Sequence, residues 1–251
     1  MKPMNISAGL LTIGLFAAHS TQAALISTSG GAAVLDTTTN LMWVSNANLA
    51  ATNTFGVSGI SAGGAMSYST AQAWIAAMNA ASYLGYSNWV LPTALPVNGS
   101  SYNMVYSTNG ATDFSYNISA PGSAYPGTQA SQMAYLFYNS LGNVGYRDIN
   151  GNLSPGFGSN SYGLFTNVQS ANNGFYWTGN ADITNPGNYL DFSLYTGGQA
   201  SNAGTTASSI YAIAVRATTS LAGAPLPEPA SLALFGIGLV GIAARFGKRR
   251  D

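Results

Sequence analysis

The sequence predicts an α+β domain that lies between two apolar segments, one at each end of the chain. Two stretches in the first 150 residues carry apolar side chains at helical spacing. Short apolar or alternating runs, separated by turns rich in Gly, Asn and Ser, are typical of strands and occur near both ends of this region. About 200 residues lie between the end segments, which is enough for one domain with its own core.

The N-terminal segment has the three parts of a secretory signal peptide. Met1-Lys2 is positively charged, residues 6–18 are apolar, and Thr21-Gln22-Ala23 is a small-residue cleavage site. We therefore expect residues 1–23 to direct the chain to the Sec translocon, and signal peptidase to cut after Ala23.

The domain that follows begins with strands. Apolar runs at Leu25-Ile26 and at Ala33–Leu35 predict two short strands, with Gly30-Gly31 as the turn between them. Leu41–Val44 is entirely apolar and predicts a buried third strand.

Two helices are expected next. The first spans about Ala71 to Leu84, with Ser69 or Thr70 as its cap and a glycine at its end. The second spans Gln129 to Leu141 and also ends at a glycine. Both have one apolar face, which we expect to pack on the core.

The last third of the domain favours strands. These are expected at Leu164-Phe165, Phe175–Trp177, Tyr189–Leu194 and Ile210–Val215, with hairpin turns at Asn172–Gly174 and Gly197-Gly198. We expect the last strand to be central, and Arg216 at its end to pair with a carboxylate such as Asp36.

Several short blocks occur in an order that resembles a known family. They are Asp36–Trp43, Gly85–Thr93, Phe175–Thr178, Tyr189–Phe192 and Ala214–Arg216. Together they resemble the Lcl C-terminal domain family, which is related to the C-type-lectin-like fold. The resemblance implies that residues 24–217 form one C-type-lectin-like domain: a mixed sheet, two helices and long polar loops, with the first and last strands close together. The chain departs from the family at Val90, where members carry Arg, and at Met78 and Ala214, where many carry Cys.

Composition excludes several kinds of function. Two Arg against five Asp leave the region between the end segments with a net charge of −3, so we expect no nucleic-acid partner. The chain has no Cys, and its one His is His19 in the signal peptide. A Ser-His-Asp triad, a Cys nucleophile and a zinc site on His or Cys are therefore unavailable. We expect no enzymatic activity; an enzyme acting on glycans through paired Asp residues among Asp148, Asp182 and Asp191 stays an alternative.

Candidate ligand-binding residues lie in a long polar insertion, residues 93–127. Tyr102, Tyr106 and Tyr116 are expected to stack on sugar rings and to bond sugar hydroxyls. The alternative is that these rings cover the core from above.

One loop is a candidate for calcium, and no other cofactor is expected. Asn180, Asp182 and Asp191 supply the oxygen ligands that calcium accepts. The alternative is that these residues only form turns.

The C-terminal segment follows a small-residue linker, residues 218–226. It has three parts: Pro227-Glu228-Pro229, an apolar run over residues 230–244, and a basic tail with Arg245, Arg249 and Arg250. As a helix the run would be about 22 Å long, short of the roughly 30 Å hydrocarbon core of a bilayer.

This order resembles the PEP-CTERM sorting signal of Gram-negative bacteria, here over residues 227–251. The resemblance implies a transient span of the inner membrane by residues 230–244 and processing by exosortase. The protein would then be exported across the inner membrane to the cell surface or the extracellular matrix. A permanent membrane anchor is the alternative.

These expectations lead to one function. We expect an exported, exosortase-sorted, non-enzymatic module that binds extracellular polysaccharide and serves adhesion in biofilm or exopolysaccharide. The alternative from another class is an inert structural component of the matrix.

Overall fold

The computed structural model describes residues 25–169, 174–206 and 209–218. The chain divides into two compact units, Met1–Ala217 and Thr218–Asp251. The expected signal peptide, the Pro-Glu-Pro motif, the apolar run and the basic tail all lie outside the described residues, as does most of the turn at Asn172–Gly174. Among the described residues, none belongs to a helix with the length and apolar character that a membrane span needs.

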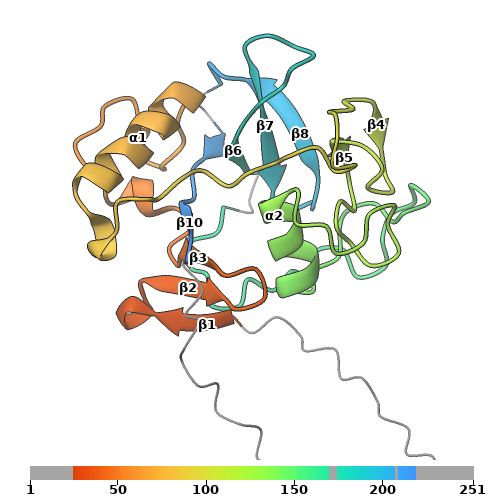
Figure 1. Cartoon of the computed structure of the whole chain (residues 1–251), viewed down its shortest axis with the longest axis horizontal. Coiled ribbons are helices and arrows are strands. Elements are labelled where there is room, and N and C mark those ends of the chain that lie inside the picture. Colours follow the sequence, from red (N-terminus) through yellow and green to blue (C-terminus); the bar gives the residue numbers. More distant parts are fainter. Residues whose placement is uncertain (1–24, 170–173, 207–208, 219–251) are drawn as a thin grey trace, which may run out of the picture. The chain divides into compact units, whose positions relative to one another are not determined.

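The described part of the chain has an α+β fold built on two sheets (Figure 1). One sheet has four strands in the order β1-β2-β3-β10, and the other has six in the order β4-β5-β8-β7-β6-β9. The strands are β1 Leu25–Thr28, β2 Ala33–Asp36, β3 Leu41–Val44, β4 Tyr106–Ser107, β5 Phe114–Ser115, β6 Phe175–Ala181, β7 Asn188–Ser193, β8 Gln199–Ala203, β9 Ile210–Tyr211 and β10 Val215–Ala217. The α+β class is confirmed, whereas the C-type-lectin-like arrangement stays a prediction.

The four-stranded sheet is antiparallel throughout, and its first three strands lie where the sequence predicts them. All four residues of β3 are buried. β3 pairs with β2 on one side and with β10 on the other, so Trp43 lies opposite both Val34 and Val215. The first and last strands of the domain thus share one sheet, at its two edges.

The stretch from β9 to β10 links the two sheets. β9 pairs in parallel with β6 at the edge of the six-stranded sheet, and β10 then joins β3. The prediction of one central strand over Ile210–Val215 is therefore wrong. Alternate residues of this stretch nevertheless pack into two different cores: Ala212 and Ala214 lie in one, and Ile213 and Val215 lie in the other.

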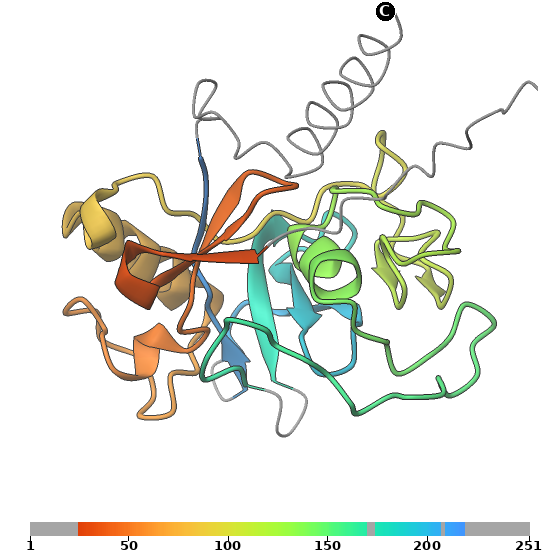
Figure 2. The same ribbon diagram turned by 90° about the horizontal axis from the view of Figure 1, so that it is seen from below.

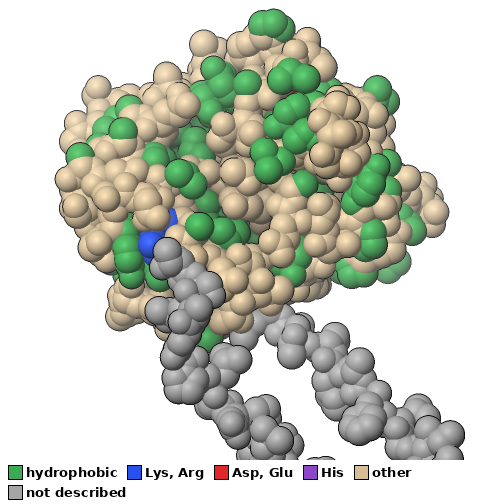
Figure 3. Space-filling view, viewed as in Figure 1, with side chains coloured by type: hydrophobic (Ala, Val, Ile, Leu, Met, Phe, Trp, Pro, Cys, Tyr) green, Lys and Arg blue, Asp and Glu red, His purple; other side chains and the backbone are tan. Residues whose placement is uncertain are grey.

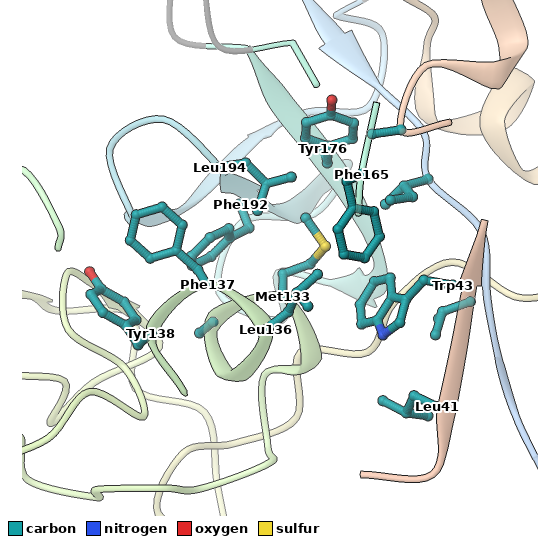
Figure 4. Close-up of a cluster of buried hydrophobic side chains, with 14 of the residues drawn as sticks. Leu41, Trp43, Met133, Leu136, Phe137, Tyr138, Phe165, Tyr176, Phe192 and Leu194 are labelled. Carbon is teal, nitrogen blue, oxygen red and sulfur yellow. The ribbon is translucent and has the colours of Figure 1, made fainter. Parts of the chain in front are cut away.

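The core between the sheets and α2 is rich in aromatic rings (Figure 4). Trp43 and Phe165 pack edge to face, with ring centroids 6.4 Å apart. Phe137 contacts Phe192 at 5.8 Å and Tyr138 at 4.8 Å. Phe165 was expected in a strand, but residues 163–166 form a turn and a single bridge instead.

The second core lies under α1, which spans Tyr68–Ala80. Trp74 and Met78 of this helix are fully buried. The helix begins three residues before the predicted start, because Ser67 is its cap and accepts a hydrogen bond from the Thr70 amide. The predicted caps, Ser69 and Thr70, are residues of the helix itself.

The second helix is shorter than predicted. α2 spans Gln132–Tyr135 and continues as one π-helical turn, Leu136–Ser140. Ser131 is its cap and accepts from the Ala134 amide, which fixes the start after the predicted Gln129. The described residues also form three short 3-10 turns: Ser29–Gly31, Leu49–Ala51 and Tyr83–Gly85.

Arg216 does not pair with Asp36, contrary to prediction. Its Nε donates to Asn88 Oδ1 at 2.7 Å, and its guanidinium lies 3.8 Å from the centroid of the Tyr86 ring. Asp36 instead accepts hydrogen bonds from the Thr38 amide and the Ser140 hydroxyl. The pairing register explains this result: Arg216 lies opposite Met42, whereas Asp36 lies opposite Leu41, and adjacent residues of a strand point to opposite faces.

Candidate functional site

An aromatic pocket of about 290 Å³ opens where β4 and β5 meet β8. Its lining combines four aromatic rings with small and polar residues: Tyr106, Phe114, Ser115, Tyr116, Phe175, Thr196, Gly198, Gln199 and Ala200. Both views place β4 and β5 on the side of this unit away from α1 (Figures 1 and 2). Apolar rings with a few polar groups among them are the usual lining of a ligand site.

Two very short strands hold the first rings of the pocket. β4 and β5 run parallel, and Tyr106 lies opposite Phe114, with ring centroids 5.4 Å apart. The next pair, Ser107 and Ser115, joins its hydroxyls at 2.7 Å. Tyr106 remains 52% exposed, so much of its ring is open to a ligand.

The Tyr116 ring packs against the β7–β8 turn, next to these two strands. Its ring lies perpendicular to that of Tyr106, with centroids 6.4 Å apart. Burial raises the pKa of its hydroxyl. A Cβ atom on Gly198 would lie 2.9 Å from the Tyr116 ring, so the turn needs glycine there to let the ring approach.

Gln199 contributes a buried amide side chain to the lining of the pocket. Its side chain is 1% exposed, and its Nε2 donates to the Asp113 carbonyl at 2.8 Å. Its Oε1 has no hydrogen-bond partner among the described residues. Because this oxygen is itself buried, a ligand in the pocket would reach it only if neighbouring side chains moved.

The loop that carries these strands is anchored by a buried carboxylate. Asp113 accepts hydrogen bonds from the Val97 amide at 2.9 Å and from the Asn103 amide at 2.7 Å. Burial raises the pKa of Asp113, and these two amides partly offset that effect. These bonds join parts of the insertion to one another, and the hydrogen bond from Gln199 to the Asp113 carbonyl ties the insertion to β8.

The structure divides the three tyrosines predicted to bind ligand. Tyr106 and Tyr116 both line the aromatic pocket, and Tyr102 does not. The Tyr102 hydroxyl donates to the Ala94 carbonyl at 3.0 Å and accepts from Asn180 Nδ2 at 3.2 Å. Tyr102 thus fastens the insertion to the end of β6.

The three predicted metal ligands have different partners. Asn180 accepts from the Ala94 amide, and Asp191 accepts from Asn202 Nδ2 at 2.7 Å inside the six-stranded sheet. Asp182 accepts from the Ser201 and Thr184 hydroxyls and from Asn185. Burial raises its pKa, but these hydrogen bonds together lower it to about 2.

These hydrogen bonds hold the loop, and the calcium site stays a prediction. Within the residues that the structure describes, no three carboxylate, His or Cys side chains group as a metal site would require.

A second pocket of about 470 Å³ lies beside α1. Ile75, Val90 and Leu91 give it an aliphatic wall, and Gln72 and Asn79 contribute amides. Its one aromatic lining residue, Tyr68, stacks on Tyr189 with ring centroids 3.5 Å apart. This pocket therefore offers a sugar ring less open aromatic surface than the first does.

Comparison with known proteins identifies the C-terminal segment. Residues 225–250 match the PEP-CTERM protein-sorting motif. This motif marks an exported protein that is sorted at the membrane to the cell surface, with exosortase as its processing partner. The corresponding part of the sequence-based expectation is confirmed. No curated protein and no solved structure gives a significant match to the chain.

The sequence analysis predicted Tyr106 and Tyr116 but none of the other lining residues of the aromatic pocket, among them Phe114, Phe175, Thr196 and Gln199. Phe114 and Tyr116 stand two residues apart, and this spacing could have placed both on one face of a strand. The contribution of Gln199 carries no comparable signal, because it depends on the pairing of β8 with β5.

Proposed function

We propose that this exosortase-sorted surface protein binds extracellular polysaccharide, without acting on it as an enzyme, through the aromatic pocket. The observation that carries the proposal is the combination of partly exposed rings, above all Tyr106, with polar side chains in the lining of one pocket. A sugar presents an apolar face that stacks on an aromatic ring, and hydroxyls that bond polar groups. We place this activity at the surface of a Gram-negative cell or in its matrix, in adhesion or biofilm.

The surface of the domain suits an uncharged ligand. Arg147 and Arg216 are the cations of the described residues, and Arg216 is 8% exposed. The face seen in Figure 3 is mostly polar and neutral, with scattered hydrophobic side chains and no acidic ones in view. Binding would therefore rest on ring stacking and hydrogen bonds rather than on salt-sensitive attraction.

The positions of the aspartates favour binding over catalysis. Hydrolysis of a glycan by two carboxylates requires both of them beside the scissile bond. Neither pocket described above is lined by an acidic residue. Asp36, Asp113 and Asp182 are each engaged by several hydrogen bonds within the fold.

An inert matrix component is the second candidate, because the rings of the pocket also pack on one another. In that case they would serve only to hold the insertion in place.

Binding to the producing cells' own extracellular polysaccharide tests the proposal. The exported protein is purified from these cells, and saturable binding is expected for the native chain. Tyr106→Ala should weaken binding by about tenfold or more, because it removes the most open ring of the pocket. The matched control is Tyr125→Ala, in the same insertion but outside the pocket, which should bind as the native chain does. Equal binding by all three proteins would contradict the pocket, and no binding by any of them would favour the inert component.

A further inference from the structure

The rings of the aromatic pocket are one end of a longer series of ring contacts. Tyr116 contacts Tyr146 at 6.2 Å, Tyr146 contacts Phe157 at 5.0 Å, and Phe157 contacts Tyr195 at 5.2 Å between ring centroids. We call the five rings Tyr106, Tyr116, Tyr146, Phe157 and Tyr195 the aromatic strip. All five side chains are partly exposed. The strip therefore presents partly open rings beyond the pocket itself.

Hydrogen bonds hold the far end of the strip to the β7–β8 turn, which also contributes to the pocket. The Tyr146 amide donates to the Thr196 carbonyl at 2.8 Å, next to the pocket. Asn160 Nδ2 donates to the Tyr195 carbonyl at 2.7 Å, which ties the loop that carries Phe157 to the β7–β8 turn. Rings from three separate segments are thus fixed beside one another, so little ordering is needed when a ligand binds.

The charged residues beside the strip are already engaged. The Arg147 guanidinium lies 4.8 Å from the Tyr146 ring centroid and donates to the Gly151 carbonyl. Asp148 accepts hydrogen bonds from the Asn150 and Asn152 amides. These two residues, one cation and one anion, have a net charge of zero, so the strip has no excess charge that would select a charged ligand.

We propose that the aromatic strip binds a linear, uncharged polysaccharide along its length, so that several successive sugars contact the protein at once. This inference rests on the proposed function. It adds that the polysaccharide is linear and uncharged, and that it lies along the strip. A pocket alone would hold one or two sugars, at a chain end or at a branch. A strip of fixed rings holds the interior of a chain, and each further sugar adds stacking surface.

The dependence of affinity on chain length tests the strip. The probe is the producing cells' extracellular polysaccharide, cut by mild acid and sorted by size into fragments from disaccharides upward. For the exported native protein, affinity should rise by about tenfold or more from the shortest fragments to those long enough to cover the strip. It should change little when salt is raised, because the ligand is uncharged.

Two variants test whether the rings at the far end of the strip cause the rise in affinity with fragment length. Phe157→Leu and Tyr195→Leu remove a ring but keep apolar bulk, so the fold should persist. Each should lower the affinity for long fragments by about tenfold and leave that for disaccharides unchanged. Tyr125→Ala, outside the strip, should change neither. If a variant unfolds, the fluorine NMR signals of native protein labelled with 3-fluorotyrosine serve instead, and those of Tyr146 and Tyr195 should shift with long fragments only.

The outcomes separate this inference from the proposed function. Equal affinity for disaccharides and long fragments would overturn the strip and leave the pocket as a site for one or two sugars. Affinity that fell steeply with salt would overturn the uncharged ligand. Failure of every fragment, and of the intact polysaccharide, to bind would overturn the proposed function and the strip together.

Discussion

Asp191 lies inside the six-stranded sheet, where a charged carboxylate is poorly solvated. Its side chain is fully buried, one oxygen accepts a hydrogen bond from Asn202, and the other has no partner among the described residues. Burial raises its pKa from 3.8 to about 7, and the Asn202 hydrogen bond offsets only part of that rise. The folded protein therefore holds a proton on Asp191 at pH values where the unfolded chain has lost it.

This difference makes stability depend on pH. Between about pH 4 and pH 7 the folded state binds more protons than the unfolded state, so the free energy of unfolding should fall as pH rises. The loss over this window is roughly 4 kcal/mol. Denaturant unfolding of the exported protein at a series of pH values measures it. No His contributes to this dependence in the exported protein, because the one His of the chain is His19, in the predicted signal peptide.

Two variants test which carboxyl group causes the dependence of the free energy of unfolding on pH. Asp191→Asn should make the slope much smaller, with the remainder coming from Asp113, whose pKa is also raised. Asp148→Asn is the control, because its carboxylate is exposed and its pKa is lowered by the amide of Asn152 and its neighbours. It therefore titrates below the window. An unchanged slope in Asp191→Asn would show that this carboxyl is not the cause.

At the scale of the element, α1 is clamped to the segment that follows it. Asn79 of the helix accepts from the Trp89 amide and donates to the Trp89 carbonyl, each at 2.8 Å. The Trp89 ring is buried, and its Nε1 donates to the Tyr83 carbonyl. A single amide side chain thus satisfies both backbone groups of a buried residue.

Removal of this clamp should destabilise the domain. Asn79→Ala leaves the amide and the carbonyl of Trp89 without partners, which costs about 2–4 kcal/mol. Thermal or urea unfolding measures the effect. Gln72→Ala, at an exposed position on the same helix, is the control: it removes one side-chain hydrogen bond, to the Tyr68 hydroxyl, but leaves no backbone group without a partner, and should cost less than about 1 kcal/mol. Equal stability of Asn79→Ala and native protein would mean that water replaces the clamp without loss.

The sequence predicts the positions of the helices and strands of this domain better than it predicts which strands pair with one another. The strands at Leu25–Thr28, Ala33–Asp36 and Leu41–Val44 follow from short apolar runs, and both helices follow from apolar spacing. The starts of the helices were misplaced because several Ser and Thr residues compete as caps, and Ser67 and Ser131 are the caps used. The first helix also ends at Ala80, four residues before the predicted Leu84.

Pairings between distant segments could not be read from local pattern. The alternation over Ile210–Val215 indicates two buried faces, but not that the stretch leaves one sheet and enters another. The candidate site shows the same limit. Open tyrosines in a polar insertion pointed to Tyr106 and Tyr116, whereas Gln199 and Phe175 enter the pocket only through the pairing of the six-stranded sheet.

At the scale of the whole molecule, a nearly uncharged domain is joined to a C-terminal sorting motif. The motif determines where the protein goes, through export and exosortase processing. The aromatic pocket and strip, in the proposed account, determine what it holds there. The domain has no Cys to form disulfides outside the cell, so its stability rests on packing such as the ring contacts of Phe137, Phe192 and Trp43.

The most direct test of this account follows the protein in the cells that make it. The native gene and a Tyr106→Ala, Tyr116→Leu double variant are expressed in the producing strain, and the share of exported protein that sediments with the extracellular polysaccharide is measured. Mass spectrometry of the same fractions shows whether the C-terminal motif has been removed. We predict that both proteins are processed alike, that the native protein sediments with the polysaccharide, and that the variant stays in the medium. Equal sedimentation of two equally processed and folded proteins would contradict the account.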